Sequence, residues 1–193
     1  MKKWLYIVIV FNIWTLRRWL SFYKLKELLS MTKQRALSLE GKLNQNGIKE
    51  RIKSTFIKKE RTGPWVIELD PTTACNLACH DCISANLLNQ GGIDPKRLLK
   101  LADEFKDIGV KAVVLIGGGE PMAHKEFGNL VKAFAEKDIH IGVTTNGTLL
   151  KRYMDVCSEH LSWLRVSVDA GSPEVFNQFR PHASGKSQFD LVI

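Results

Sequence analysis

The sequence predicts an α/β fold with a parallel sheet for residues 64–193, where strand-like and helix-like segments alternate. A second observation is that several of the expected strands carry polar side chains on one face. A third is that the cysteine-rich and glycine-rich segments directly follow expected strands. A polar sheet face that ends in such loops is typical of a barrel, so we expect a partial, TIM-like (βα) barrel preceded by a helical N-terminal extension.

Four βα units are visible after Pro64. Asp94 can cap the first helix with Pro95 at its first position, and Gly109 stands where a glycine that ends a helix belongs. Strands joined by helices in this order form a parallel sheet with right-handed crossovers. The strands are expected at residues 65–71, 111–116, 139–145 and 163–169, and the helices at residues 94–108, 126–137, 149–160 and from 173 onward.

Three of these strands alternate polar and apolar residues, whereas parallel strands covered on both faces usually read as continuous apolar runs. A doubly wound sheet has no place for a polar face, but a barrel that encloses a polar cofactor does. Internal pairing, such as Arg165 with Glu68, would account for only one of the strands. The shared polar face consists of Glu68, Asp70, His140, Gly142, Thr144, Asn146, Arg165, Ser167 and Asp169.

The composition is that of a folded domain, with 193 residues of which 45% are hydrophobic and 25% charged, so disorder, collagen and coiled coil are excluded. The net charge of +8 is unevenly distributed. Residues 1–63 hold 15 Lys and Arg against 4 Asp and Glu (+11), and residues 64–193 hold 13 against 16 (−3). The basic excess therefore belongs to the extension and not to the expected barrel.

Residues 1–30 form an apolar and basic segment whose uncharged run covers residues 4–16. A membrane-spanning helix needs about 20 residues, and no small-residue cleavage site follows, so neither a span nor a signal peptide is expected. Two interpretations stay open. Residues 4–23 could form an interfacial helix in contact with a membrane surface, or Met31 could be the true start and the segment an upstream extension.

Residues 31–63 form a basic extension that is compatible with a helix from residue 36 to 61. Ile48, Ile52 and Phe56 make one narrow apolar stripe, which predicts a helix packed on the rest of the chain. Aromatic residues do not interleave with its lysines, so the charges indicate a solvated face and nucleic-acid binding is not expected. Residues 62–64 (Thr-Gly-Pro) mark the boundary to the domain at residues 64–193.

Cys75, Cys79 and Cys82 lie within eight residues directly after the first expected strand. This spacing is a poor disulfide framework and a good thiolate ligand set, which predicts a reducing, cytoplasmic setting. Thiolates bind zinc or an iron-sulfur cluster, but no second ligand pair follows to complete a structural zinc site, and His80 could contribute only from beside Cys79. Three cysteines on a four-iron cluster leave one iron open, which favours a catalytic cluster. Cys157 is expected to be a packing residue on a helix.

The second expected strand ends in a glycine-rich segment, residues 117–121 (GGGEP). Successive glycines let a ligand approach the backbone, and Glu120 adds a carboxylate. A dinucleotide-binding loop is excluded, because Met122 occupies the third glycine position and a glutamate would face the pyrophosphate. The arrangement suits an ammonium group. The last two strands end near Asn146 and Ser167, so all four special segments lie at the carboxyl ends of strands.

The three-cysteine motif together with Gly118, Gly119 and Glu120 resembles the signature of the radical S-adenosylmethionine (radical SAM) superfamily, over residues 65–193. The resemblance implies an enzyme whose 4Fe-4S cluster binds S-adenosylmethionine through its open iron. Reductive cleavage of this cofactor would yield a 5′-deoxyadenosyl radical that abstracts hydrogen from a substrate.

By position, the resemblance implies that Cys75, Cys79 and Cys82 are the cluster ligands. Glu120 and the backbone of Gly118 and Gly119 would then receive the amino group of S-adenosylmethionine. The ribose or sulfonium end would meet the remaining candidates at the strand ends, and the methionine carboxylate would meet an arginine. These candidates are Asn146, Ser167 and Asp169 for the former and Arg180 for the latter.

The sequence departs from the family pattern in two respects. Asp81 precedes the third cysteine where the family usually has an aromatic residue that helps to seat the adenine. Four βα units are visible of an expected six, so we expect an incomplete domain whose last strand, residues 163–169, leaves an unpaired edge. A flavodoxin or ferredoxin is expected as reductant, and a peptide, an amino sugar or a nucleotide as substrate. The alternative is a zinc or iron-sulfur binding protein without radical chemistry.

Overall fold

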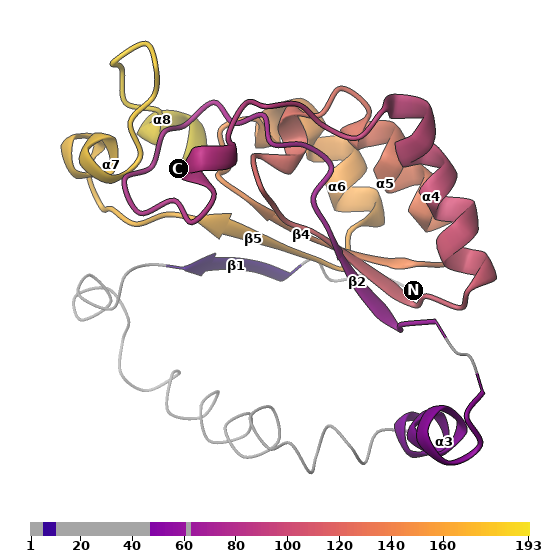
Figure 1. The fold of residues 1–193 in the computed structure, drawn as a ribbon. Coiled ribbons are helices and arrows are strands. Elements are labelled where there is room, and N and C mark those ends of the chain that lie inside the picture. Colours follow the sequence, from indigo (N-terminus) through magenta and orange to yellow (C-terminus); the bar gives the residue numbers. More distant parts are fainter. Residues whose placement is uncertain (1–5, 11–46, 61–62) are drawn as a thin grey trace. The chain divides into compact units, whose positions relative to one another are not determined.

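The computed structural model describes residues 6–10, 47–60 and 63–193 (Figure 1). The chain divides into two compact units, one formed by residues 1–12 with 64–193 and the other by residues 13–63. The first unit contains the sheet and all of the expected site residues.

The first unit is built on a five-stranded parallel sheet in the order β1-β5-β4-β3-β2. The four strands after residue 64 have the predicted sequence positions and the predicted parallel pairing, with Val113 beside Ile67 and Ile141 beside Val113. The strand bounds are β1 Tyr6–Val10, β2 Val66–Leu69, β3 Ala112–Leu115, β4 His140–Thr145 and β5 Trp163–Ser167.

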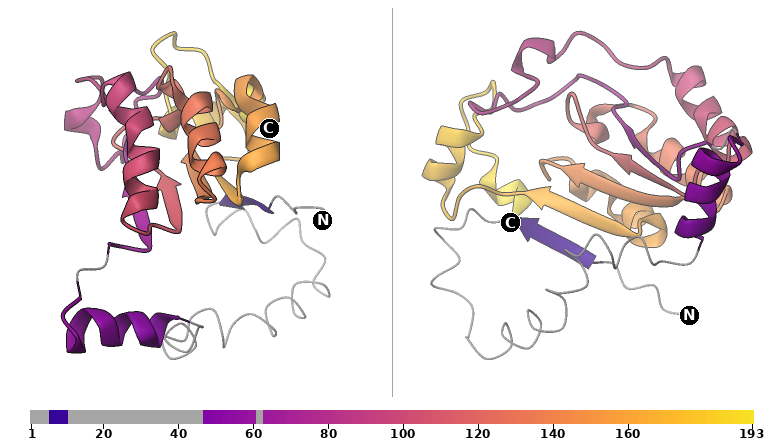
Figure 2. Two further views of the ribbon diagram at one scale, coloured as in Figure 1. Left: turned by 90° about the vertical axis from the view of Figure 1, so that its right-hand side faces the viewer. Right: turned by 60° about the horizontal axis from the view of Figure 1, so that its bottom comes forward.

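Three helices cover one face of the sheet, as Figures 1 and 2 show. Asp94 caps the first of them as expected, since its Oδ1 accepts hydrogen bonds from the backbone N–H groups of Lys96 and Arg97. The helix expected at residues 149–160 begins as a 3-10 turn, Leu150–Tyr153. The covering helices are α4 Pro95–Asp107, α5 Phe127–Glu136 and α6 Met154–His160, and two short helices, α7 Pro173–Phe179 and α8 Phe189–Val192, follow β5.

The hydrophobic core lies between the sheet and these helices. The rings of Phe105 and Phe134 stack with their centroids 5.7 Å apart, and this pair joins α4 to α5. Cys157 is buried in the same core, where burial raises the pKa of its thiol to about 11. The prediction that Cys157 is a packing residue agrees with this position. The strands contribute Val113, Leu115, Ile141, Val143, Leu164 and Val166 to the core.

The opposite face of the sheet is the predicted polar face. Glu68, His140 and Arg165 are exposed, and these helices leave this face uncovered (Figure 2). Gly142 lies on it beneath Trp163, whose indole would be 2.2 Å from a Cβ at that position, so a larger residue would displace the ring. The sheet curves without closing, which makes the unit a partial (βα) barrel. The fold class expected from the sequence is therefore confirmed.

The N-terminal segment differs from its prediction. Tyr6–Val10 is a strand that pairs in parallel with β5, so an interfacial helix over these residues is wrong. The physical reason is that Tyr-Ile-Val-Ile-Val is aromatic and β-branched, which suits a strand, while the outer edge of β5 offers unpaired backbone groups. The unpaired edge expected at residues 163–169 is consequently occupied. Residues 1–5 and 11–30 of the segment lie outside the described residues.

The second unit contains α3, Ile48–Ile52, which continues as a π-helical turn, Lys53–Ile57. The helix expected at residues 36–61 is thus present in its later half, and residues 36–46 lie outside the described part. Neither helical segment buries a residue. That the stripe of Ile48, Ile52 and Phe56 packs on the rest of the chain stays a prediction. Over the residues that the structure describes, no helix is long and apolar enough to cross a membrane.

Candidate functional site

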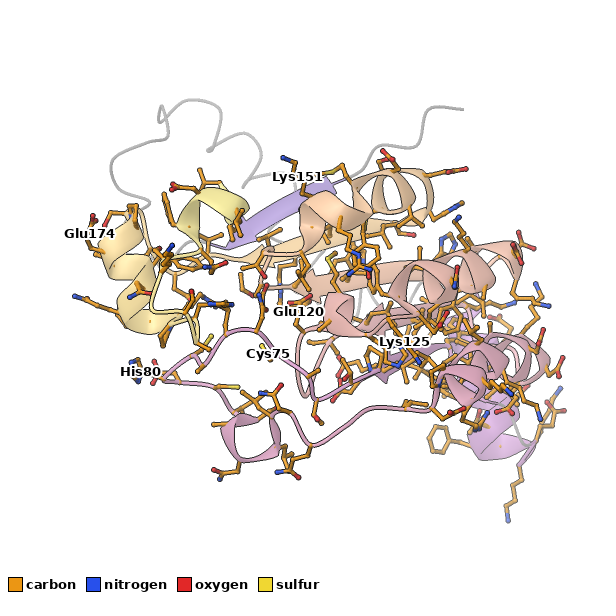
Figure 3. The ribbon with its side chains drawn as sticks, turned by 90° about the horizontal axis from the view of Figure 1, so that it is seen from above. Cys75, His80, Glu120, Lys125, Lys151 and Glu174 are labelled. Carbon is orange, nitrogen blue, oxygen red and sulfur yellow. The ribbon has the colours of Figure 1, made fainter. Side chains whose placement is uncertain are left out.

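The expected site residues gather at the carboxyl ends of the strands, where the loops that follow β2, β3, β4 and β5 meet. Figure 3 shows Cys75 and Glu120 beside each other and His80 at the margin of the molecule. The backbone N–H of Glu120 donates to the carbonyl of Ala74 at 2.8 Å, which joins the loop after β3 to the loop after β2. The cysteine-rich and glycine-rich segments, which the sequence places at the ends of successive strands, are therefore in contact.

The loop that carries the three cysteines (residues 73–89, the cysteine loop) is held at both of its ends by backbone and side-chain hydrogen bonds. Thr73 and Asn89 form a bridge across it, and the side chain of Asn89 accepts from the backbone N–H of Cys75 at 3.0 Å. Leu77, between the first two cysteines, is buried against Phe176 of α7. Buried apolar contact at this point keeps the loop against the barrel while its cysteines stay half-buried.

All three thiols are free and half-buried. Burial raises the pKa of the Cys75 and Cys79 thiols, and the Arg180 guanidinium lowers that of Cys79 against this trend. Over the described residues, no three His, Cys, Asp or Glu side chains converge closely enough to hold a metal ion.

The glycine loop after β3 lies directly against the cysteine loop. A Cβ at Gly119 would be 2.4 Å from the carbonyl oxygen of Ala74 and 2.5 Å from the backbone of Thr73, so any other residue would separate the two loops. At Gly118 the nearest atoms to a Cβ, on Asp70 and Thr73, are 3.6 Å away. Close approach of two backbones is thus the reason for Gly119.

Glu120 is buried between the ends of two strands, and its expected contact with the amino group of the cofactor stays a prediction. Its side chain is 2% exposed, and its carboxylate accepts three hydrogen bonds from within the protein. The donors are the hydroxyl of Thr145 at 2.7 Å, the backbone N–H of Asn146 at 2.7 Å and the backbone N–H of Met122 at 3.1 Å. Burial raises the pKa of Glu120, and the three donors lower it by less. The carboxylate therefore joins the end of β3 to the end of β4.

Asn146 is also buried, with 8% exposed. Its Oδ1 accepts from the backbone N–H and the hydroxyl of Thr148, at 3.0 and 2.7 Å. Its Nδ2 donates to Oδ1 of Asn76 at 2.9 Å and lies 3.9 Å from Sγ of Cys75. Asn76 completes a ring by donating to the Thr148 hydroxyl at 2.7 Å. This ring fastens the cysteine loop to the end of β4.

Arg180 follows α7 and lies between an acid and a thiol. Its guanidinium forms an ion pair with Asp169, in which Nε donates to Oδ2 at 2.5 Å. Its Nη1 lies 3.8 Å from Sγ of Cys79. Ser167 ends β5 two residues before Asp169 and is half-buried. The structure therefore brings Asp169 and Arg180 together beside the cysteine loop.

Two predicted features lie further out. Asp81 and His80 are exposed on the cysteine loop, where His80 makes no contribution to the interior of the site (Figure 3). Conversely, the sequence analysis missed Asn76, Thr145 and Thr148, which complete the buried network. Thr145 and Thr148 lie on either side of Asn146, which was a predicted site residue, and Asn76 follows the first cysteine. Their proximity to those motifs was the available signal.

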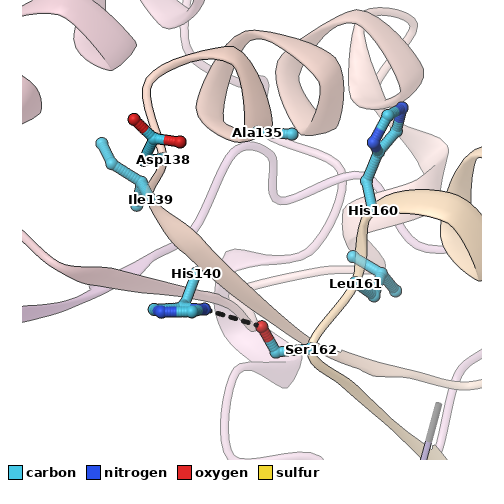
Figure 4. A pocket seen from close by; sticks show the side chains of 7 residues that line it. All are labelled: Ala135, Asp138, Ile139, His140, His160, Leu161 and Ser162. Atoms are coloured by element: carbon cyan, nitrogen blue, oxygen red, sulfur yellow. Dashed lines mark hydrogen bonds between the residues drawn. The ribbon is translucent and has the colours of Figure 1, made fainter. Parts of the chain in front are cut away.

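A cavity of about 480 Å³ lies elsewhere, at the amino ends of β4 and β5 (Figure 4). The imidazole of His140 and the hydroxyl of Ser162 lie 3.3 Å apart on its wall, and His160 stands on the opposite side. None of the cysteines and none of the predicted cofactor contacts line it. Barrel enzymes carry their active sites at the other end of the strands, so this cavity is not assigned to the site.

Residues 69–192 match the family model described as the Radical SAM superfamily. The chain belongs to this superfamily of enzymes. Among curated relatives, the probable GTP 3′,8-cyclase of Archaeoglobus fulgidus is 35% identical over 107 residues, which are 54% of this chain and 36% of that protein. The mycofactocin maturase MftC of Mycolicibacterium smegmatis is 29% identical over 138 residues, 67% of this chain and 33% of the relative. The chain thus spans about a third of these relatives.

Solved structures of radical SAM proteins share the fold. Streptococcus suis SuiB bound to precursor peptide SuiA has a TM-score of 0.58 at 20% identity, over 86% of this chain and 43% of that chain. The tagged protein anSMEcpe with bound AdoMet has a TM-score of 0.55 at 25% identity, over 67% of this chain and 38% of that chain. These likenesses support the partial barrel, and the family expected from the motifs is confirmed.

Proposed function

We propose that this protein holds a 4Fe-4S cluster on Cys75, Cys79 and Cys82 and uses it to cleave S-adenosylmethionine reductively. When bound, the cluster would supply one electron that breaks a carbon-sulfur bond of the cofactor, giving methionine and a 5′-deoxyadenosyl radical that takes a hydrogen atom from a substrate. The observation that carries the proposal is the position of the three thiols, on one loop at the carboxyl end of the barrel and against the glycine loop.

The donor chemistry of the residues present fits this cluster, because the three free thiols lie on one loop. Thiols are the ligands that iron-sulfur clusters require, and their half-buried position limits access of water to a bound cluster. Two of the three thiols have an N–H donor within reach, from Asn146 on Cys75 and from Arg180 on Cys79. Hydrogen bonds to the sulfurs are a normal part of such sites.

We assign the contacts to S-adenosylmethionine to polar groups of the site that still have free hydrogen-bonding capacity. The Glu120 carboxylate is already occupied by three internal donors, so we assign the ammonium group of S-adenosylmethionine first to the backbone of Gly118 and Gly119, with Glu120 as the group that holds this loop. Arg180 would receive the methionine carboxylate through the guanidinium hydrogens that Asp169 leaves free. Ser167 and Asp169 stay candidates for the ribose. Asp81 stands where the family usually has an aromatic residue, so the contact to the adenine must be made by other residues.

The substrate and partners belong to the proposal as well. We infer a low-potential one-electron donor of the flavodoxin or ferredoxin type and a cytoplasmic setting, because half-buried thiols that must bind iron need reducing conditions. The open polar face of the sheet suits a peptide, an amino sugar or a nucleotide. Contact of residues 4–23 with a membrane surface, proposed from the sequence, loses support where Tyr6–Val10 pairs with β5.

Anaerobic reconstitution with iron and sulfide tests the proposal directly. The full chain should bind about four irons and four sulfides, show a charge-transfer absorbance that dithionite bleaches, and form 5′-deoxyadenosine from added S-adenosylmethionine. Alanine at Cys75, Cys79 or Cys82 should abolish the absorbance. Cys157→Ala is the matched control, because that thiol is 1% exposed in the core and should leave the iron content unchanged.

Three results would overturn the proposal. One is equal iron content in all four cysteine variants. A second is a single tightly bound zinc ion with no binding of iron and sulfide, which would favour the zinc protein without radical chemistry. A third is a reduced cluster that never yields 5′-deoxyadenosine in the presence of S-adenosylmethionine.

A further inference from the structure

The buried ring of Asn76, Asn146 and Thr148 does more than fasten two loops together. Every polar atom of the Asn146 side chain has a partner in it, since Oδ1 accepts from Thr148 and Nδ2 donates to Asn76. Nδ2 also donates to Sγ of Cys75, at a distance of 3.9 Å between the nitrogen and the sulfur. Asn146 is 8% exposed, so water does not compete freely for this hydrogen.

The orientation of this amide is fixed by chemistry. The backbone N–H of Thr148 can only donate, so the atom 3.0 Å from it must be the amide oxygen of Asn146. The amide nitrogen then has to face Asn76 and Cys75. A flipped amide would place its NH₂ group against that N–H and leave a buried donor without an acceptor. The network thus presents an N–H group to the sulfur.

The backbone of Asn146 is held as firmly as its side chain. Its N–H donates to the Glu120 carboxylate at 2.7 Å, and the same carboxylate holds the neighbouring Thr145 hydroxyl. Glu120 therefore fixes the position of the Asn146 backbone, and Thr148 fixes the orientation of the Asn146 side-chain amide. This double restraint lets a single hydrogen bond act on Cys75 with little loss of conformational entropy.

We propose that Asn146 is a positioning residue for the cluster, whose amide N–H holds Cys75 and raises the potential at which the cluster accepts an electron. The inference rests on the proposed function, because it requires the cluster. An N–H···S hydrogen bond withdraws negative charge from a ligand sulfur and so favours the reduced, more negative form. Asn146 would then act on the cluster through Cys75, and not on the ribose as the sequence suggested.

Two neutral variants of the reconstituted full chain separate this role from general support of the loop. Asn146→Ala removes the N–H donor. Thr148→Val disturbs the same ring but keeps the Thr148 backbone N–H that orients Asn146, so the donor to Cys75 remains. Iron content, the thermal unfolding midpoint and the midpoint potential by redox titration with electron paramagnetic resonance are measured for both.

We expect the potential of Asn146→Ala to fall while that of Thr148→Val stays at the wild-type value. Loss of one hydrogen bond to a charged group should lower the equilibrium constant for one-electron reduction about tenfold, or ~59 mV. Equal potentials in all three proteins, or an equal fall in both variants, would overturn the inference while the proposed function stands. A wild-type chain that assembles no cluster would overturn both.

If Asn146→Ala unfolds or binds no iron, a second pair of variants gives the answer. Asn146→Asp keeps the acceptor for Thr148 and loses the donor to Cys75. Asn76→Asp adds the same charge one residue from Cys75 and keeps the acceptor for Asn146. A lower potential in Asn146→Asp than in Asn76→Asp supports the role of the N–H group, and equal potentials contradict it.

Discussion

The two ends of the sheet treat polar side chains in opposite ways. At the carboxyl ends, Glu120, Thr145, Asn146 and Thr148 are each less than 9% exposed and hydrogen-bonded to one another. At the amino ends, His140 is exposed and His160 half-buried around an open cavity. A polar group that is buried must have its partners within the protein, whereas one at the surface can use water.

This difference shows why the size of a cavity alone does not locate a site. The cavity at the amino ends has a volume of about 480 Å³, but Asp138 and His140 on its wall are exposed to solvent. At the carboxyl ends, burial of the polar side chains costs desolvation energy, and their hydrogen bonds hold them in fixed positions. These buried side chains hold the loops that carry the cysteines and the glycines. The following predictions test whether this contrast is real, from the largest expected effect to the smallest.

Glu120→Ala should have the largest effect on stability. Three buried donors would lose their acceptor, and each unsatisfied group costs about 1–3 kcal/mol, so we expect the free energy of unfolding to fall by about 3 kcal/mol or more. Urea denaturation of the apo protein measures it. If Glu120→Ala still folds, its affinity for S-adenosylmethionine should fall at least tenfold, because the glycine loop loses the hydrogen bonds that hold it. An unchanged unfolding midpoint would contradict the view that the polar groups at the carboxyl ends depend on partners within the protein.

Asp169→Ala should have a smaller effect on stability, of about 1 kcal/mol, because the ion pair with Arg180 is partly solvated. Its effect on cofactor binding should be larger than its effect on stability, since Arg180 would lose its anchor beside Cys79. Isothermal titration of the reconstituted protein with S-adenosylmethionine measures this. Glu104→Ala, which removes the exposed ion pair with Arg97, is the matched control and should leave both quantities unchanged.

The pH dependence of stability isolates the burial of Glu120. Burial raises its pKa in the folded state, so the folded state binds its proton more tightly than the unfolded state does. The stabilising contribution is complete below the ordinary carboxyl pKa and is lost as the pH rises through the raised value. Unfolding free energies from pH 4 upward, compared with those of Glu120→Gln, should therefore show a decline that the variant lacks. A rise of the difference with pH would contradict this sign.

His140→Ala should have the smallest effect. The side chain is exposed, and its contact with Ser162 at 3.3 Å is open to water, so we expect a change in unfolding free energy within about 0.5 kcal/mol. Iron content and affinity for S-adenosylmethionine should also equal those of the wild type. A loss of either would mean that the amino ends contribute to the site.

Much of the fold could be predicted from the sequence because local signals there agree with tertiary structure. Asp94 and Pro95 begin a helix, the alternation around Thr144 and Arg165 predicts a one-sided polar sheet, and all four strands after residue 64 were expected. The N-terminal strand was missed, since its run of apolar residues suits a strand or an interfacial helix equally well. Pairing with the distant β5 decided between the two.

The sequence by itself determined the family and the end of the barrel at which the three cysteines lie. Cys75, Cys79 and Cys82 are close together in the chain, and loops that follow parallel strands must meet at one edge, so no tertiary detail was needed. Only the tertiary structure decided that Glu120 faces inward and that Asn146 turns its amide to Cys75. Those roles depend on hydrogen bonds between residues more than 20 positions apart in the chain, and on burial that makes each hydrogen bond obligatory.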